Sequence, residues 1–390
     1  MKSFLVCLNQ SHFLRATRNR NVQTNAAVWA ISIVTQRCIF GFFTLLLFLA
    51  APLLGYAQWQ MQDSHSAASL RGIHAVNGSV AWATGTDGTV LRTQDGGAHW
   101  QRCTSPAGAE KLDFRGVWAW GADRATILSS GPGDQSRVYL TTDACAHWSE
   151  EIRNKDKDGF WDALTFQTAP GLPGDAGMLV GDPVNGRFAT FTLAPKRGWL
   201  PDEKSCAARD GETGFAASNS SVVVFGAGRY ILATGGKGGP RVLLSPLLAY
   251  NDSSKDCLAV TVPLSGGAES SGAFSIAFRD GDHGVVVGGD YKKPEVSTGT
   301  AAWTADGGRH WTAASKPPHG YRSAVAWDSE AKVWIAVGTN GSDISRNDGK
   351  TWDRLDDGKW NAISPPFAVG PDGRIGKLRP DGVKSTQDRR

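Results

Sequence analysis

Amphipathic helical patterns longer than a turn or two are missing from this sequence, and their absence leaves an all-β fold as the expectation. Metal-binding patterns are missing as well, because there is no C-x-x-C pair and the eight histidines are scattered along the chain. The glycine-rich run 235–239 is followed by neither Gly-Lys-Ser/Thr nor a helix, so it does not predict a phosphate-binding loop. We therefore expect no metal and no cofactor.

Acidic side chains are absent from residues 1–57, which carry the basic residues Lys2, Arg15, Arg18, Arg20 and Arg37. An apolar run follows over 39–54, and a small-x-Ala site ends at Ala57. This order of features is typical of a cleaved signal peptide. The run is shorter than the roughly 20 residues of a membrane span, which is the alternative. The long leader also allows translation to start near Val34. We predict a periplasmic or secreted protein, cleaved near Ala57.

An excess of positive charge is also missing once this leader is removed. Five of the 41 basic residues lie in the leader, which leaves 36 against 37 acidic residues and a net charge of −1. The basic pI of the whole chain therefore comes from the leader. Nucleic acid is not predicted as a partner.

Four cysteines remain after cleavage, and an even number in an exported chain suggests disulfides. Four cysteines allow three pairings. We favour Cys103–Cys145 and Cys206–Cys257, because Cys103 and Cys145 lie beside equivalent motifs in adjacent repeats.

That motif is an eight-residue box with a hydroxyl residue, an acid or amide two later, a glycine two after that and a tryptophan three beyond. Copies span 93–100, 304–311 and 345–352, and a fourth at 141–148 has Cys145 in place of the glycine. Such a box predicts a tight hairpin that satisfies its own backbone, with the tryptophan packed between sheets. We assign structural roles to Asp95, Gly97, Trp100, Asp143, Trp148, Asp306, Gly308, Trp311, Asn347, Gly349 and Trp352.

Seven repeats begin with a large apolar or aromatic residue, at Leu70, Phe114, Trp161, Phe215, Phe274, Tyr321 and Trp360. Short strands, regular turns and four strands per period predict a seven-bladed β-propeller of four-stranded blades. The last repeat lacks a strand, which we expect the N-terminal strand around 58–62 to supply, because Trp59-Gln60 repeats Trp100-Gln101. Closure makes 58–380 one domain, with 381–390 a disordered tail. We expect the second strand of blade 4 at Val222–Phe225. Connections that are longer or rich in glycine are expected between second and third strands at 181–186, 234–240 and 288–299.

The residue after each start is expected to line the mouth of the central channel, on the face opposite the box hairpins. This ring contains Arg71, Arg115, Asp162, Ala216, Ser275, Arg322 and Asn361. Three arginines would form a positive funnel suited to carboxylate or phosphate groups. The alternative is that each arginine pairs with an acid of a neighbouring blade or faces solvent.

The boxes and the seven-blade pattern resemble the Asp-box (BNR) propellers, which include sialidases, and more closely the photosystem II stability/assembly factor family. The resemblance covers about 60–378 and rests on the segments LRGIHAV, GTDGTVLRTQDGGAHW, FRGVWAW, VGDPVNGRF and AVGPDGRIGKL. It implies an exported seven-bladed propeller that binds a protein partner, as an assembly factor or scaffold, without catalysis. Nothing in the sequence indicates a photosynthetic host.

Two functions are carried forward. The first is a monomeric, non-enzymatic propeller that binds a protein partner, with a membrane-associated complex among the candidates. The alternative is a carbohydrate-active propeller, either a sialidase-like glycoside hydrolase or a glycan-binding module. Arg71, Arg115 and Arg322 could imitate the sialidase arginine triad, but no F/Y-R-I-P segment is present and glutamates are sparse. We therefore predict no catalytic residue.

Overall fold

The computed structural model describes residues 58–167, 176–194, 196–202, 204–226, 229–246 and 256–380. The predicted signal peptide and the predicted C-terminal tail lie outside these ranges. Within the described ranges, no helix is both long and apolar enough to cross a membrane.

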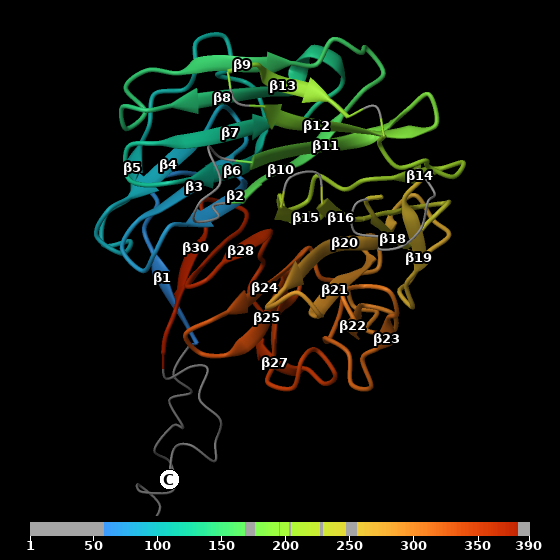
Figure 1. Ribbon diagram of the computed structural model, residues 1–390. Helices are drawn as coiled ribbons and strands as arrows, with labels where there is room; N and C mark the ends of the chain where they lie inside the picture. The colour runs from blue at the N-terminus through green and yellow to red at the C-terminus, as the bar shows by residue number, and fades with distance from the viewer. Residues whose placement is uncertain are drawn as a thin grey trace, which may run out of the picture. The chain divides into compact units, whose positions relative to one another are not determined.

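Antiparallel meanders of four strands build the blades, which are numbered here in chain order (Figure 1). Blade 1 contains β2 (Leu70–Ala75), β3 (Ala81–Gly85), β4 (Val90–Thr93) and β5 (Gln101–Arg102). Blade 2 contains β6 (Phe114–Ala119), β7 (Ala125–Ser129), β8 (Arg137–Thr141) and β9 (Ser149–Arg153). Blade 3 contains β10 (Trp161–Gln167), β11 (Ala176–Val184), β12 (Arg187–Ala194) and β13 (Gly198–Pro201). Blade 4 contains β15 (Val222–Gly226), β16 (Arg229–Ala233), β18 (Arg241–Leu244) and β19 (Leu258–Thr261).

The remaining blades follow the same plan. Blade 5 contains β20 (Ser271–Phe278), β21 (His283–Asp290), β22 (Ala301–Ala305) and β23 (Thr312–Ala313), and it is extended at β20 by β17 (Gly235–Gly236) and β14 (Glu212–Thr213). Blade 6 contains β24 (Ala324–Asp328), β25 (Val333–Gly338), β26 (Gly341–Ser345) and β27 (Asp353–Asp356). Blade 7 contains β28 (Ala362–Ser364), β29 (Phe367–Val369), β30 (Ile375–Leu378) and β1 (Trp59–Gln62). The predicted seven-bladed propeller is confirmed.

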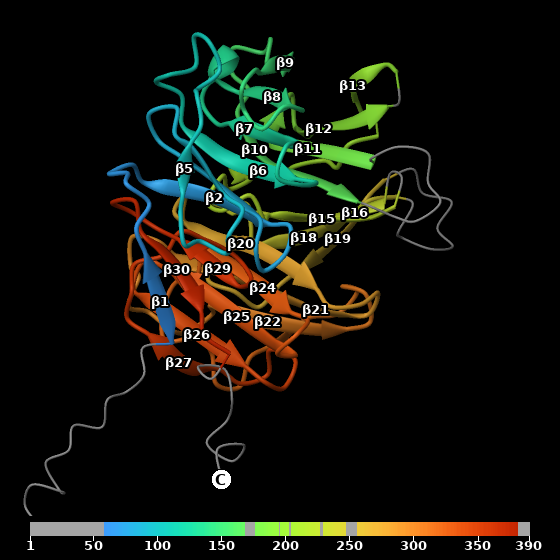
Figure 2. The same ribbon diagram turned by 90° about the vertical axis from the view of Figure 1, so that its left-hand side faces the viewer.

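The N-terminal strand closes the ring, as predicted. Strand β1 pairs antiparallel with β30, with Trp59 opposite Leu378, and Figure 2 shows the blue β1 beside the red β30. The ring of Trp59 lies 5.0 Å from that of Trp360 at the start of blade 7. Closure pairs the free edge of blade 7, so that edge is no longer open to aggregation.

Apolar side chains gather between neighbouring blades. Trp82 of blade 1 packs against Phe114 and Tyr139 of blade 2, and Trp334 of blade 6 packs against Val285 of blade 5. Trp82, Phe114 and Trp334 have no exposed surface, and burying a side chain of this size contributes roughly 3 kcal/mol. The blades are therefore held together by apolar contacts as well as by the closing strand.

The four sequence boxes form equivalent turns between the third and fourth strands. The Thr93 hydroxyl donates to Asp95 Oδ1 (2.9 Å) and accepts the N–H of Gly97 (2.9 Å). Asp95 also accepts the N–H of His99 (2.9 Å), and this bond holds the pKa of Asp95 below its ordinary value. The same hydroxyl-to-side-chain bond measures 3.0 Å at Thr141, 2.8 Å at Thr304 and 3.1 Å at Ser345.

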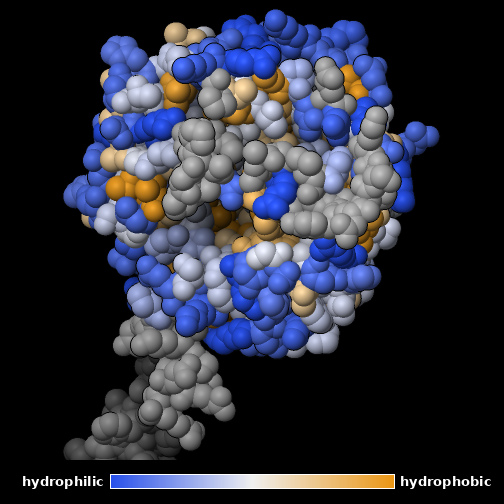
Figure 3. Space-filling view, viewed as in Figure 1, coloured by the Kyte–Doolittle hydropathy of each residue, from blue (hydrophilic) through white to orange (hydrophobic). Residues whose placement is uncertain are grey.

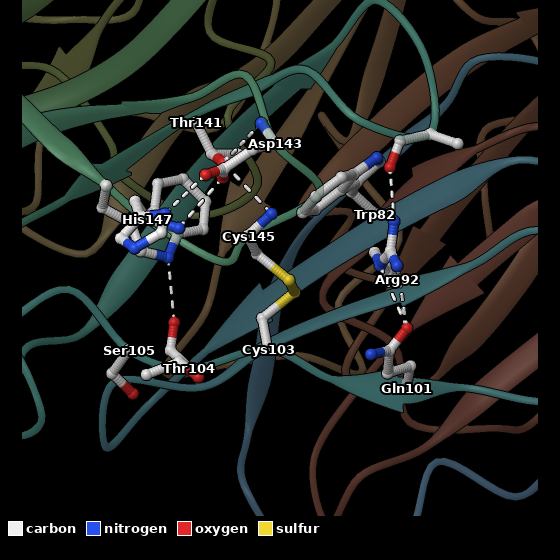
Figure 4. Close-up of a disulfide and its surroundings, with 12 residues drawn as sticks. Trp82, Arg92, Gln101, Cys103, Thr104, Ser105, Thr141, Asp143, Cys145 and His147 are labelled. Atoms are coloured by element: carbon white, nitrogen blue, oxygen red, sulfur yellow. Dashed lines mark hydrogen bonds and ion pairs between the residues drawn. A yellow bond between two sulfur atoms is a disulfide. The ribbon is translucent and has the colours of Figure 1, made fainter.

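Both predicted disulfides are present. Cys103 follows β5 of blade 1 and reaches the box turn of blade 2 at Cys145, with the Cα atoms 5.6 Å apart (Figure 4). Cys145 replaces the box glycine and keeps its left-handed backbone, with φ of 66°. Cys206 is bonded to Cys257. Two disulfides are consistent with an oxidising compartment.

Two sequence expectations about strands are corrected. Blade 4 begins at β15, which was expected to be its second strand, and the expected first strand around 215–218 is not extended into the sheet. In blade 3 the expected connection 181–186 lies mostly within strands. Only Asn185 and Gly186 form the turn, with φ of 51° and 77°. Positive φ at both central residues is what a tight two-residue hairpin requires.

Candidate functional site at the channel mouth

Three innermost strands begin with a β-bulge, and the bulged residue faces the channel mouth. The pairing of β2 with β3 shifts between Leu70 and Gly72, which leaves Arg71 as the extra residue. The same irregularity displaces Arg115 in β6 and Asp162 in β10. A bulge re-aims a side chain, and all three residues line one cavity at the mouth.

Blade 5 has its bulge one residue earlier than the position predicted from its aromatic start, Phe274. In β20 the shift falls between Ala273 and Ser275, so Phe274 takes the place that Arg71 has in blade 1. Ser275 is fully buried, and its hydroxyl lies 2.7 Å from that of Ser220. The expectation that Ser275 lines the mouth is corrected, because a shift of one residue in a strand turns the side chain to the other face.

Blade 6 departs from the predicted register in the same way. The N–H of Ser323 bonds to the second strand of its blade, as the N–H of Asn361 does in blade 7, and Ser323 and Asn361 line the cavity. Arg322 is fully buried, with its Nε 2.6 Å from Asp343 Oδ2, and it also contacts His319. The predicted funnel of three arginines is therefore reduced to two.

The segment 215–221 crosses the channel below this mouth. Asn219 Oδ1 accepts the N–H of Leu164 in blade 3 at 2.8 Å, and Asn219 Nδ2 donates to a carbonyl of blade 2 at 3.3 Å. Ser218 donates to a carbonyl just before blade 6, and Ser220 bonds to a hydroxyl of blade 5. One segment thus bonds to four sides of the ring, and we call it the plug. Phe215, Ala216 and Ala217 of the plug line the pocket at the mouth.

This pocket has a volume of about 670 Å³, which is the size of typical small-ligand sites. Arg71 and Arg115 reach it from blades 1 and 2. The Nε of Arg115 donates to Asp113 at 2.8 Å, whereas Arg71 has no hydrogen bond or ion pair among the described residues, and its Nε is buried. Burial and the nearby Arg115 guanidinium lower the pKa of Arg71.

Two carboxyl groups lie in the same pocket. Asp162 is only 2% exposed, and burial raises its pKa well above the ordinary value, with a further increase from the neighbouring Asp182. Burial also raises the pKa of Asp182, but Asp182 accepts hydrogen bonds from Thr213 and Gly214. The pocket therefore combines basic and acidic side chains rather than a single sign of charge.

Aromatic side chains complete the lining. Phe215 of the plug stacks on Phe274, with ring centroids 3.7 Å apart and planes inclined by 10°. The ring of Tyr321 meets Phe274 edge-on at 4.9 Å, and Tyr291 is 46% exposed. Aromatic and arginine side chains together are the composition of strong protein-binding sites.

The sequence boxes lie away from this pocket. The start of β2 pairs with the end of β3, whereas the start of β3 pairs with the end of β4, where the box begins. The boxes therefore extend from the opposite face, and their Asp, Asn and Gly residues are engaged in their own turns. In the described part of the chain, no group of three His, Cys, Asp or Glu residues is placed to hold a metal ion.

Hydrophilic side chains dominate the described surface seen in Figure 3, where apolar residues form only small separate groups.

No protein-family model matches the chain, and no curated protein matches it. Solved structures do match. A structure of YCF48 bound to a D1 peptide aligns with a TM-score of 0.53 at 16% identity, covering 84% of this chain and 98% of that one. YCF48 from Cyanidioschyzon merolae gives 0.50 at 18% identity, with 83% and 100% coverage. The WD40 propeller domain of Doa1 gives 0.53 at 11% identity, with 85% and 99% coverage. These similarities establish the propeller fold.

Sequence reasoning missed several pocket residues, namely Phe274, Ser323, Asp182, Tyr291 and the plug. A signal for the first two was available. A glycine packs against the backbone two residues before the mouth position in blades 5 and 6, as Gly288 does against Gly272 and Gly338 against Tyr321. The same contact is made by Gly85 in blade 1, so alignment of blades 5 and 6 on this glycine, rather than on the aromatic start, would have given the correct register.

Proposed function

We propose that this protein is a binding propeller that holds a segment of a protein partner in the pocket at the channel mouth. The observation that carries the proposal is the pocket itself, which is lined by aromatic residues and by Arg71, a side chain without a hydrogen bond or ion pair among the described residues. Arginine and aromatic residues dominate the binding energy of protein interfaces. The structure of YCF48 with a D1 peptide supports the proposal, because it is an example of this fold holding a peptide.

The site of action that we propose is an oxidising compartment, reached through the N-terminal signal peptide. The two disulfides support this compartment, since such bonds persist outside the reducing cytosol. A role as an assembly factor or scaffold, with a membrane-associated complex as the partner, follows from the resemblance of the sequence segments quoted above.

Site-specific crosslinking of the full chain tests the proposal. A benzophenone amino acid is placed at Tyr291 beside the pocket or, as a control, at His99, whose side chain is 89% exposed on the box face. We expect one discrete adduct from position 291 and none from position 99. Arg71→Ala should reduce the adduct several-fold. Arg102→Ala, an exposed arginine of the same blade, should leave it unchanged.

Three results would contradict the proposal. The first is an adduct that forms equally at both positions or at neither. The second is an adduct that persists at full yield in Arg71→Ala. The third is hydrolysis of fluorogenic glycosides by the wild-type protein that is abolished by Asp162→Asn, because this would make the pocket an active site.

A further inference from the structure

Asp162 is exceptional among the buried acids of the described residues. Three acidic side chains there are less than 9% exposed, namely Asp162, Glu212 and Asp343. Glu212 is held by Arg241, whose Nε lies 2.9 Å away, and Asp343 is held by Arg322 at 2.6 Å. Asp162 alone has neither an ion pair nor a hydrogen bond within the described ranges.

The burial of the Asp162 carboxyl group without a partner has a cost in folding free energy. The ionised form of a buried carboxyl group without a partner costs several kcal/mol, and the raised pKa of Asp162 shows that the free protein disfavours that form. A Cβ on Gly214 would lie 2.2 Å from Asp162 Oδ2, so only a glycine there leaves the carboxyl group room. The stability of the fold alone would favour a residue that cannot ionise, such as asparagine, at position 162.

The nearby cation does not neutralise Asp162. Arg71 lines the same cavity, yet the two side chains form no ion pair. Arg71 makes no hydrogen bond or ion pair within the described ranges, and the acid that attracts it electrostatically is Asp113. Arg115, the cation that does interact with Asp162 electrostatically, already donates its Nε to Asp113. One pocket is therefore lined by an acid and a base, neither of which has a hydrogen bond or an ion pair within the described ranges.

We infer that Asp162 is the counter-ion for a basic group, a lysine or arginine side chain of the bound partner segment, and that Arg71 receives an acidic group of the same segment. The inference rests on the proposed function and adds the charge pattern of the partner. The stacked rings of Phe215 and Phe274 offer an apolar surface to the methylene groups of the basic side chain. A guanidinium or ammonium group gains further from the face of an aromatic ring.

A peptide array tests the inference with the full-length protein. The probes are blocked pentapeptides, acetyl-Ala-X-Ala-Z-Ala-amide, in which X and Z are lysine, glutamate, glutamine or norleucine. The wild type should retain peptides with one lysine and one glutamate at least tenfold better than the doubly glutamine peptide. Asp162→Asn should lose the lysine preference and keep the glutamate preference, and Arg71→Ala should do the reverse. Asp87→Asn makes the same charge change at an exposed turn of the same face and should change neither.

The preference for lysine should also increase with pH, because only the ionised carboxylate attracts a cation. Two groups act on Asp162 from neighbouring elements: Asp182 favours the protonated form and Arg115 favours the ionised form. The midpoint of urea unfolding of Asp162→Asn should equal or exceed that of the wild type, since the variant removes a buried carboxyl group that has no hydrogen bond or ion pair within the described ranges.

The outcomes separate the inference from the proposed function. If the wild type retains no peptide above the neutral one, both are overturned. If glutamate is preferred but lysine is not, or if Asp162→Asn keeps the lysine preference, the inference fails and the proposed function stands. A lower urea midpoint for Asp162→Asn would show that the carboxylate has a structural role, and it would also overturn the inference.

Discussion

The box at 141–148, in which Cys145 replaces the glycine, allows two opposing contributions to stability to be measured separately. These are the stabilisation by the disulfide and the backbone strain at Cys145. Cys145 occupies a position where the other three boxes have glycine, and its φ of 66° lies in the left-handed region. Three variants separate the bond from the backbone strain: Cys103→Ala, Cys145→Gly and the double variant. Cys103→Ala removes the bond and keeps the strain, whereas the double variant removes both.

The expected sizes follow from the chain. The bond joins cysteines 42 residues apart, and the entropy of closing a loop of this length corresponds to about 4 kcal/mol of stability. A non-glycine residue in the left-handed region costs about 1 kcal/mol. Cys103→Ala should therefore lower the free energy of unfolding by about 4 kcal/mol. The double variant should recover about 1 kcal/mol of this loss.

Urea unfolding followed by tryptophan fluorescence under oxidising conditions measures these differences, and thiol titration verifies the state of each cysteine. The pair Cys206→Ala and Cys206→Ala/Cys257→Gly is the matched control. Cys257 does not have a positive φ, so glycine there should bring no recovery. The reasoning is refuted if the first double variant is no more stable than Cys103→Ala, or if Cys103→Ala costs less than about 1 kcal/mol.

Three further results are expected from urea unfolding. Burial lowers the pKa of His74 to about 4 in the folded protein. The stability that comes from keeping this imidazole neutral is therefore fully present above pH 6.5 and is lost as the pH falls toward 4. The loss is about 3 kcal/mol, and His74→Gln should remove most of this pH dependence. Gln62→Ala leaves the indole N–H of Trp100 without its acceptor at 2.9 Å and should cost about 2 kcal/mol, whereas the exposed Gln60→Ala should be neutral. Asn219→Ala removes bonds from the plug to blades 2 and 3 and should cost about 2 kcal/mol without loosening blade closure.

The propeller could be predicted because its signals are local and repeated. Each box encodes its own turn, as the bonds around Thr93 and Asp95 show, and four copies reveal the period. The closing strand was predictable because the Trp59-Gln60 pair repeats the exit of blade 1. The disulfide between Cys103 and Cys145 was predictable because both residues lie beside the boxes of adjacent blades.

The pocket was predictable only where the first strand keeps the same register. Arg71, Arg115 and Asp162 follow an apolar start directly, and the structure places them together. In blades 5 and 6 the aromatic start lies one residue away from the equivalent position. Successive side chains of a strand point to opposite faces, so a shift of one residue moves a side chain from one face to the other. Ser275 and Arg322 are buried as a result.

The sequence by itself determined the class of fold, the number of blades, the closing strand and the disulfide between Cys103 and Cys145, because each depends on short motifs that repeat along the chain. The pairing of Cys206 with Cys257 then followed as the remaining pair. Only the tertiary structure decided what the channel mouth contains. The plug at 215–221 reads locally as the start of a strand, and it takes its place by hydrogen bonds to four sides of the ring. The unpaired states of Asp162 and Arg71 are decided in the same way, since the partners of a charge come from blades that are distant in the chain and meet only when the ring closes.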